Sequence, residues 1–248
     1  MEVHAHTHTA RKKWTHYFWE FLMLFLAVFC GFLAEYQLEH KIEKEREKVY
    51  MNSLYQDLKS DTLNLGILLK NTKDDIDNYD SLFNIFRSKQ YQQETSGAYF
   101  FGRKLVTIRV FYPTNGTTTQ LENSGGLRLI RSRAIVDSIQ SYKQTISLLT
   151  SIQEFQNEHF VLARSAMGKI FDADVFDTMT GDGSKPLERP VINYPLMPFT
   201  KSELNEFHIP MNFIKRNKIT QISIIKKLQT KAVDLMHLLQ EKYKIKEH

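Results

Sequence analysis

The chain has 248 residues, with ten glycines, six prolines and a formal net charge of +5. This length accommodates one membrane segment and one helical domain, and the scarcity of glycine and proline favours long helices over many short strands. Acidic and basic residues are interspersed along the chain, so no clustered basic face for nucleic acid is predicted. The single cysteine, Cys30, excludes an internal disulfide, a Cys-ligated zinc site and a thiol redox pair.

The first predicted element is an uncharged run at residues 21–34, bounded by Glu20 and Glu35. These residues would span roughly 21 Å as a helix, which is short of a hydrocarbon core of about 30 Å. A core helix or a signal peptide would suit that length better. However, amphipathic aromatic residues stand on both sides, and counting from Tyr17 to Tyr36 gives about 20 residues, enough to cross a bilayer.

The residues near possible cleavage sites argue against removal of this run as a signal. Cleavage after Ala34 would place Phe32 where a small residue is needed, and a lipoprotein signal ending at Cys30 would place Phe29 before the cysteine. We therefore predict an uncleaved single-pass helix in contact with membrane lipid at residues 14–36. The predicted anchor residues are Trp14, Tyr17, Trp19, Phe21, Leu22, Leu24, Phe25, Leu26, Phe29, Phe32, Leu33 and Tyr36.

Glu20 is the one acidic residue inside this predicted span. The simpler interpretation places its carboxylate one turn inside the interface, where the helix dipole favours a negative charge. The alternative is a polar contact with a partner helix, which would promote oligomers. Ala27 and Gly31 offer a small-residue face for the close approach of such a helix.

The charges around the span give a close balance for its orientation. Basic residues stand before it at 11–13 and after it at 41–48, so the positive-inside rule is nearly tied. The compact basic triplet and the short tail favour a cytoplasmic tail at residues 1–13, with the large domain on the other side. Residues 37–50 are mostly charged, and we predict a solvated helical stalk there.

Residues 51–248 are predicted to form a helical bundle domain. The first helix continues to residue 86 with an apolar stripe that includes Met51, Leu58 and Leu65, and Gly66 is a possible bend. Residues 91–126 are irregular. Within them, residues 105–112 alternate like a short strand, but a lone strand lacks a partner for its backbone, so an extended segment or a short helix is equally expected.

A second long helix is predicted from residue 126, with a stripe that includes Leu149, Ile152, Phe155, His159 and Leu162. Residues 172–200 form a second irregular region. Thr200 and Glu203 make a capping box that opens a short helix, and a third long helix covers roughly residues 212–245, with apolar residues including Ile219 turned inward. The predicted fold is therefore all-α, an antiparallel bundle of three long helices plus short helices.

Two clusters resemble metal sites, and for both we favour a simpler interpretation. His4, His6 and His8 alternate in the tail, which predicts adventitious metal affinity of a disordered segment rather than a preorganised site. Four aspartates, at 172, 174, 177 and 182, suggest a calcium loop, but Phe176 and Gly183 occupy positions that an EF-hand reserves for oxygen ligands. A polar surface loop is predicted instead.

No nucleophile, phosphate-loop, zinc-protease or kinase motif is found in the sequence. We therefore expect no enzymatic activity and no cofactor. His159 and His208 have no companion residues that spacing would identify, and a histidine on a helix face is more often structural.

Two stretches resemble a known group of proteins. The stretch "FWEFLMLFLAVFCGFLAEYQLEHKIEKEREKVYMNSL" is similar to the N-terminal region of uncharacterised Bacteroidetes single-pass inner-membrane proteins with a periplasmic helical domain, over about residues 14–60. The stretch "LENSGGLRLIRSRAIVDSIQSY" resembles the middle helix of that group. The resemblance implies a Gram-negative inner membrane and a periplasmic domain, and it implies no activity or catalytic residue.

The expected function is a membrane-anchored scaffold or interaction module that forms a homo-oligomer. A membrane-protein partner is a further possibility, and no nucleic acid is expected. Two alternatives remain: a sensor subunit that relays ligand binding through the stalk to a membrane partner, and an oligomeric pore lined by Glu20.

Overall fold

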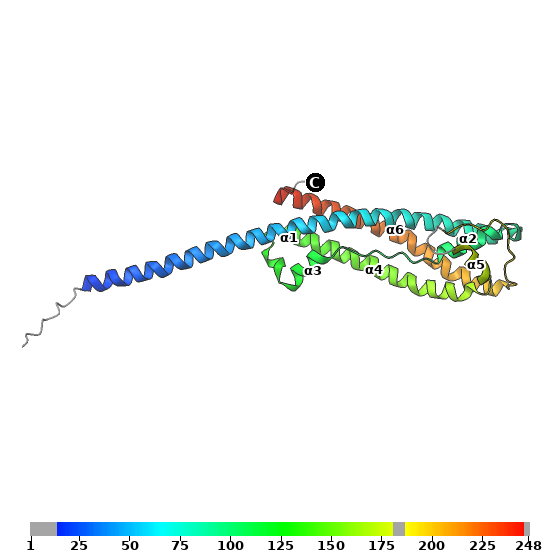
Figure 1. Cartoon of the computed structure of the whole chain (residues 1–248), viewed down its shortest axis with the longest axis horizontal. Helices are drawn as coiled ribbons and strands as arrows, with labels where there is room; N and C mark the ends of the chain where they lie inside the picture. The colour runs from blue at the N-terminus through cyan, green and yellow to red at the C-terminus, as the bar shows by residue number, and fades with distance from the viewer. Residues whose placement is uncertain (1–13, 181–186, 246–248) are drawn as a thin grey trace, which may run out of the picture. The chain divides into compact units, whose positions relative to one another are not determined.

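The computed structural model describes residues 14–180 and 187–245 (Figure 1). Over these residues the chain forms helices and no β-strand, so the predicted all-α fold is confirmed. The α-helices are α1 (Trp14–Arg87), α2 (Thr95–Leu105), α3 (Gly116–Asn123), α4 (Arg133–Met167), α5 (Ala173–Thr180) and α6 (Lys201–Tyr243), and two short 3₁₀ helices are η1 (Tyr91–Gln93) and η2 (Gly126–Leu129). The chain divides into a first unit, Met1–Tyr50, and a second unit, Met51–His248.

The second unit is a bundle of the C-terminal part of α1 with α4 and α6. Lys218 on α6 bonds Asp75 on α1, and Gln240 near the end of α6 bonds Tyr55, so α6 runs antiparallel to α1. On α4, the hydroxyl of Tyr142 bonds Asp61 of α1, and farther along both helices Phe160 and Phe83 share one hydrophobic cluster.

The helix α4 therefore runs in the same direction as α1, and the predicted opposed directions apply to α6 against the other two (Figure 1). The reason lies in the connection between α1 and α4. After α2, residues 106–115 run back along the bundle without regular secondary structure and reach α3 at its opposite end (Figure 1). We call residues 106–115 the crossover segment.

The bundle core follows the apolar stripe that the sequence predicts in α1. Its buried residues recur at intervals of three and four and include Met51, Leu58 and Leu65, as expected for one face of a helix. Around the ends of α1 and α4 and the start of α6, an aromatic cluster also takes in α2 and α5. The helix α2 lies so close that a Cβ at Gly102 would come within 2.8 Å of the Phe171 ring.

Two predicted helix starts and one predicted loop differ from the structure. The predicted short helix and third helix are one helix, because α6 starts at Lys201 behind the predicted Thr200–Glu203 capping box and continues through Pro210. A proline inside a helix removes one backbone hydrogen bond, but here Pro210 and the neighbouring Phe207 and Met211 are buried, and their packing offsets this loss. The second long helix starts at Arg133 rather than at 126, after a glycine in the left-handed conformation at 125.

The third difference concerns the aspartate-rich stretch, for which the sequence predicts a surface loop. Residues 173–180 form α5, and Val175 and Met179 on this helix are buried in the core. The side chain of Asp172 accepts a hydrogen bond from the amide of Asp174 in the first turn of α5. The two apolar residues four positions apart were the available helical signal.

The predicted inward stripe of α4 is correct at Leu149 but wrong at Phe155 and Leu162, which are exposed. From residue 153 onward the inner face carries Gln153 and Gln156 in place of apolar residues. The amide of Gln156 donates to the side-chain oxygen of Gln221 on α6 at 2.9 Å, which satisfies both buried groups. Ile219 on α6, also predicted inward, is exposed.

Candidate functional site

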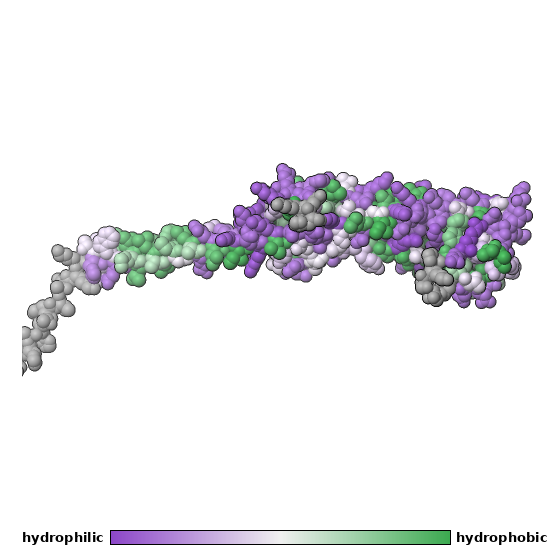
Figure 2. Space-filling view, turned by 45° about the horizontal axis from the view of Figure 1, so that its top comes forward, coloured by the Kyte–Doolittle hydropathy of each residue, from purple (hydrophilic) through white to green (hydrophobic). Residues whose placement is uncertain are grey.

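The apolar N-terminal part of α1 is one candidate site. Among the described residues, α1 is the one helix that is long enough and apolar enough to cross a membrane. None of its most apolar 18-residue stretch is buried inside the structure. Figure 2 shows a hydrophobic band over this part of the helix. Phe21, Phe25 and Phe29 stack along one face, with ring centroids 6.2 and 5.9 Å apart. By its length and composition this segment is a candidate membrane span.

The possible intramembrane contact residues lie on the same helix. The Glu20 carboxylate is 3.9 Å from Nε2 of His16, one turn toward the N-terminus. This contact lies within one turn of the same helix, so both interpretations of Glu20 remain predictions. Ala27 and Gly31 are exposed and one turn apart, and a Cβ at Gly31 would meet nothing within 4 Å.

A buried ionic cluster lies in the second unit and joins three parts of the bundle. The Asp75 carboxylate on α1 accepts from Lys218 Nζ on α6 at 2.8 Å and from Arg109 of the crossover segment at 2.7 Å. The side chains of Asp75 and Lys218 are 3% and 4% exposed. Burial lowers the pKa of Lys218, and the nearby Asp75 opposes this shift.

The ring of Tyr79 lies next to this cluster. Burial raises its pKa well above the ordinary value, and the charge of Asp75 raises it further. The three charged groups bond to one another, whereas the Tyr79 hydroxyl is buried without a hydrogen-bond partner among the described residues. The charged groups are thus suited to holding α1, α6 and the crossover segment together. Sequence reasoning missed it, although Asp61 and Asp75 occupy positions of the apolar stripe of α1 and could have been identified as buried acids.

The crossover segment is held by side chains from both neighbouring long helices. Asp61 of α1 accepts from the Thr114 amide at 2.7 Å, and Gln153 of α4 accepts from the Phe111 amide at 3.4 Å. Arg164 of α4 donates to the carbonyl of Val106 at 2.6 Å. These side chains bond to backbone groups of the crossover segment, which has no neighbouring strand to do so.

The second oxygen of Asp61 accepts from the Tyr142 hydroxyl at 2.7 Å. Burial raises the pKa of Tyr142, and the hydrogen bond to Asp61 and its charge add to this shift. A small cavity of about 100 Å³ adjoins this pair and is also lined by Leu54, Pro113 and Lys143. Both oxygens of Asp61 are thus engaged by the protein itself, which indicates a structural role.

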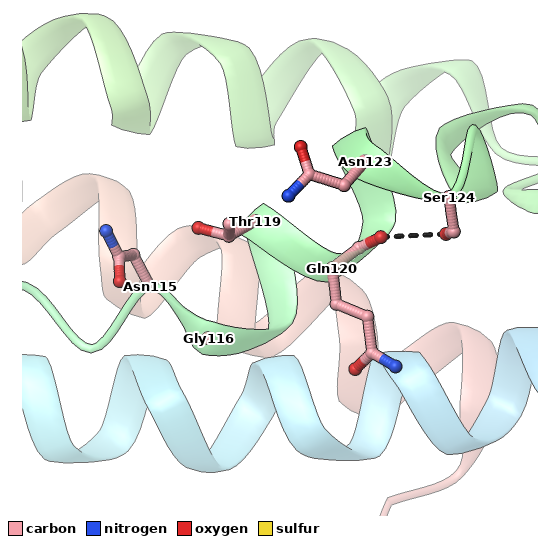
Figure 3. Close-up of a pocket in the computed structure, with 6 residues that line it drawn as sticks. All are labelled: Asn115, Gly116, Thr119, Gln120, Asn123 and Ser124. Atoms are coloured by element: carbon pink, nitrogen blue, oxygen red, sulfur yellow. Dashed lines mark hydrogen bonds between the residues drawn. The ribbon is translucent and has the colours of Figure 1, made fainter.

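A shallow polar pocket lies along α3 (Figure 3). Asn115, Thr119 and Asn123 follow one another at four-residue intervals on this short helix, and the Ser124 hydroxyl donates to the Gln120 carbonyl at 2.7 Å. The lining is Asn115, Gly116, Thr119, Gln120, Asn123 and Ser124. These side chains can form hydrogen bonds with a ligand but carry no titratable group for acid–base chemistry.

The first metal-site candidate, the histidines of the tail, lies outside the described residues, and the second, the aspartate-rich stretch, lies partly within them. His4, His6 and His8 lie outside the described residues, as does Asp182. Within residues 14–180 and 187–245, no group of three potential ligands is placed to hold a metal ion. His208 packs against the rings of Phe83 and Phe86, and His159 lies against Phe155 and Phe213.

No protein-family model matches the chain, and no curated protein or solved structure matches it. The function of the chain is therefore inferred from the geometry of the described residues.

Proposed function

We propose that this chain is a single-pass membrane protein whose helical bundle acts as a scaffold or interaction module and assembles with further copies of itself. One observation carries the proposal. The helix α1 holds an exposed apolar segment of membrane-spanning length and continues without interruption into the bundle. A shared helix attaches the binding surfaces of the bundle directly to the bilayer.

The interior of the bundle supports a scaffold role. Two buried carboxylates have their partners within the bundle. Asp75 accepts from Lys218 and Arg109, and Asp61 accepts from the Thr114 amide and the Tyr142 hydroxyl. Satisfied polar groups of this kind rigidify a core and specify one arrangement of helices. We assign no catalytic residue and no cofactor to this chain.

The proposed location is a Gram-negative inner membrane, with the tail at residues 1–13 in the cytoplasm and the bundle in the periplasm. The compact basic triplet before the span favours this orientation, and the resemblance to the Bacteroidetes group implies the same compartment. Membrane lipid is the partner of the anchor residues.

The first test is membrane extraction followed by labelling. Full-length protein should remain in the pellet after alkaline carbonate treatment and ultracentrifugation, and detergent should release it. In a Cys30→Ser background, a cysteine at Val49 should react with a membrane-impermeant maleimide in cells with a permeabilised outer membrane, whereas a cysteine at Thr7 should react only after lysis. Recovery in the supernatant without detergent, or a mature N-terminus beyond Ala34, would contradict the proposal.

A sensor role is the second candidate, and one observation favours it. The same helix carries the proposed span and Asp75, whose two cationic partners come from α6 and the crossover segment. A ligand that disturbed this cluster would act directly on the helix that enters the membrane. Ligand-dependent crosslinking of the span to a second membrane protein would favour this role over the scaffold. The pore alternative gains no such support, since Glu20 contacts His16 of its own helix.

A further inference from the structure

The helix α4 carries a second apolar row on its outer flank. Its members are separated by four, three, four and three residues, which is the spacing of alternating d and a positions in a coiled coil. They are Leu148, Ile152, Phe155, His159 and Leu162, and we call them the outer seam. The buried row that faces the bundle, Leu149, Gln153, Gln156 and Phe160, is displaced by one residue, so α4 presents apolar contacts in two directions.

Three of the five outer-seam residues are exposed, and Ile152 and His159 are half-buried. Leu148, Phe155 and Leu162 are 50%, 46% and 57% exposed. The ring of His159 lies 4.5 Å from that of Phe155 and 5.2 Å from that of Phe213 on α6, measured between centroids. Phe213 is exposed as well and extends the apolar surface onto α6. A contiguous patch of this kind marks an interaction surface.

We propose that the outer seam is the contact between two copies of this chain, packed as a parallel two-stranded coiled coil of α4 against α4. This inference rests on the proposed function, because anchoring brings both copies to one membrane. In each copy, α1 enters the bundle at Met51. Since α4 runs in the same direction as α1 within the bundle, two bundles side by side have parallel α4 helices.

Charges beside the seam complement one another across such a two-fold contact. Glu158 occupies the g position, while the e position is Gln156, which is bonded to Gln221. The helix α6 therefore lies along the e flank. Its exposed Arg216 follows Phe213 by three residues and so shares the face of α6 that carries Phe213. Within the described residues, no ion pair is formed by either Glu158 or Arg216. A parallel pairing lets Glu158 of one copy face Arg216 of the other.

The test uses full-length protein in native membranes and in mild detergent. Leu162→Glu places a charge in the seam and should raise the dimer dissociation constant by about tenfold or more, because a buried unpaired charge is costly. Val161→Glu is the matched control. Val161 directly precedes Leu162 and is 56% exposed, but it occupies a c position, outside the a and d positions of the outer seam. It should leave the dimer unchanged, and both variants should keep the helix content of the unmodified chain by circular dichroism.

Cysteine crosslinking tests the direction of pairing in a Cys30→Ser background. Single cysteines at Leu148 and at Leu162 should each form dimers through the same position on both copies, and a cysteine at Val161 should not. When the two single-cysteine proteins are produced together, crosslinks only between 148 and 162 would show antiparallel helices and overturn the parallel contact. Glu158→Arg should weaken the dimer, and adding Arg216→Glu should restore it. Failure of this rescue would overturn the proposed charge pairing.

The outcomes separate this inference from the proposed function. Oligomers that survive Leu162→Glu would overturn the outer seam but leave a membrane scaffold in place. Only monomer in native membranes would overturn both the seam and the proposed self-assembly. Specific crosslinking of the seam cysteines to a different protein would overturn the second copy as occupant.

Discussion

Asp75 and Lys218 form a buried ion pair that contributes to the stability of this bundle. An unpaired charge in a protein interior is strongly destabilising, whereas a paired and hydrogen-bonded one is tolerated. Here the carboxylate has two cationic partners, Lys218 and Arg109, and the pair with Lys218 is almost fully buried. The nearby pair of Lys215 and Asp80 joins the same two helices but is partly exposed.

We expect Lys218→Met to lower the free energy of unfolding by about 1.5–3 kcal/mol, because Asp75 keeps Arg109 as a charged partner but loses a buried, charge-assisted hydrogen bond. The matched control is Lys215→Met on the same helix, for which we expect less than about 1 kcal/mol because water screens an exposed pair. Denaturant unfolding followed by circular dichroism in detergent gives both values. Equal losses in the two variants would contradict the role of the buried cluster.

His208 is a second residue with a distinct environment. Burial lowers its pKa to about 4, and the charge of Arg87 acts in the same direction. Its Nε2 atom is buried without a hydrogen-bond partner among the described residues. The folded state therefore holds a neutral imidazole, while the unfolded chain binds a proton near pH 6.5.

This difference predicts a loss of stability in acid. As pH falls from about 6.5 toward 4, the unfolded state takes up a proton that the folded state does not, and His208 removes about 2–3 kcal/mol of stability. His208→Phe should reduce the pH dependence of unfolding between pH 7 and 4 by this amount. His237→Gln, an exposed position on α6, should leave the pH dependence unchanged. An identical profile for all three proteins would refute the prediction.

At the scale of elements, the crossover segment depends on its neighbours. An extended segment outside a sheet has no regular hydrogen bonds of its own. Asp61 supplies an acceptor to the Thr114 amide and a second one to Tyr142 on α4. One side chain thereby fixes the segment and the parallel placement of α4 beside α1.

We expect Asp61→Ala to destabilise the protein by about 2–4 kcal/mol, since it leaves two buried donors without acceptors. Hydrogen exchange of residues 107–117 should accelerate more than exchange in α6. Ser60→Ala is a suitable control, because the Ser60 hydroxyl makes only an exposed 3.4 Å contact with the Thr114 hydroxyl. Unchanged exchange in the crossover segment after Asp61→Ala would show that other contacts suffice.

Periodicity predicted the long helices of this chain, but it could not predict what breaks or joins them. The stripe of α1 and the capping box at Thr200 were sufficient to locate α1 and the start of α6. Pro210 lies between the predicted short helix and the predicted third helix, but it is buried among residues that come together only in the fold. Phe155 looked like a core residue because it follows Leu149 through Ile152 at three-residue spacing. Only the placement of Gln153 and Gln156 against their neighbours shows that the buried row is displaced by one residue.

On the scale of the whole molecule, the apolar part of α1 is the candidate span on which the proposed membrane attachment of the bundle rests. Near the centre of a spanning helix, each lysine disfavours insertion by about 2.5–3.5 kcal/mol. Leu24→Lys combined with Val28→Lys should therefore move much of the protein out of the carbonate-resistant fraction. Leu38→Lys with Val49→Lys changes two residues of similar type and exposure outside the uncharged run and should leave the protein in the pellet. Equal extraction of both double variants would argue against a span.

The contacts between α1 and α6 join residues far apart along the chain, because Tyr55 bonds Gln240 and Asp75 bonds Lys218. Such separations slow folding, since a long loop must close before the contacts form. During synthesis α1 emerges first, and the last helix must follow before Asp75 gains its lysine. The nascent chain would therefore wait with an incomplete interior, which predisposes it to aggregation or proteolysis until the C-terminal helix arrives.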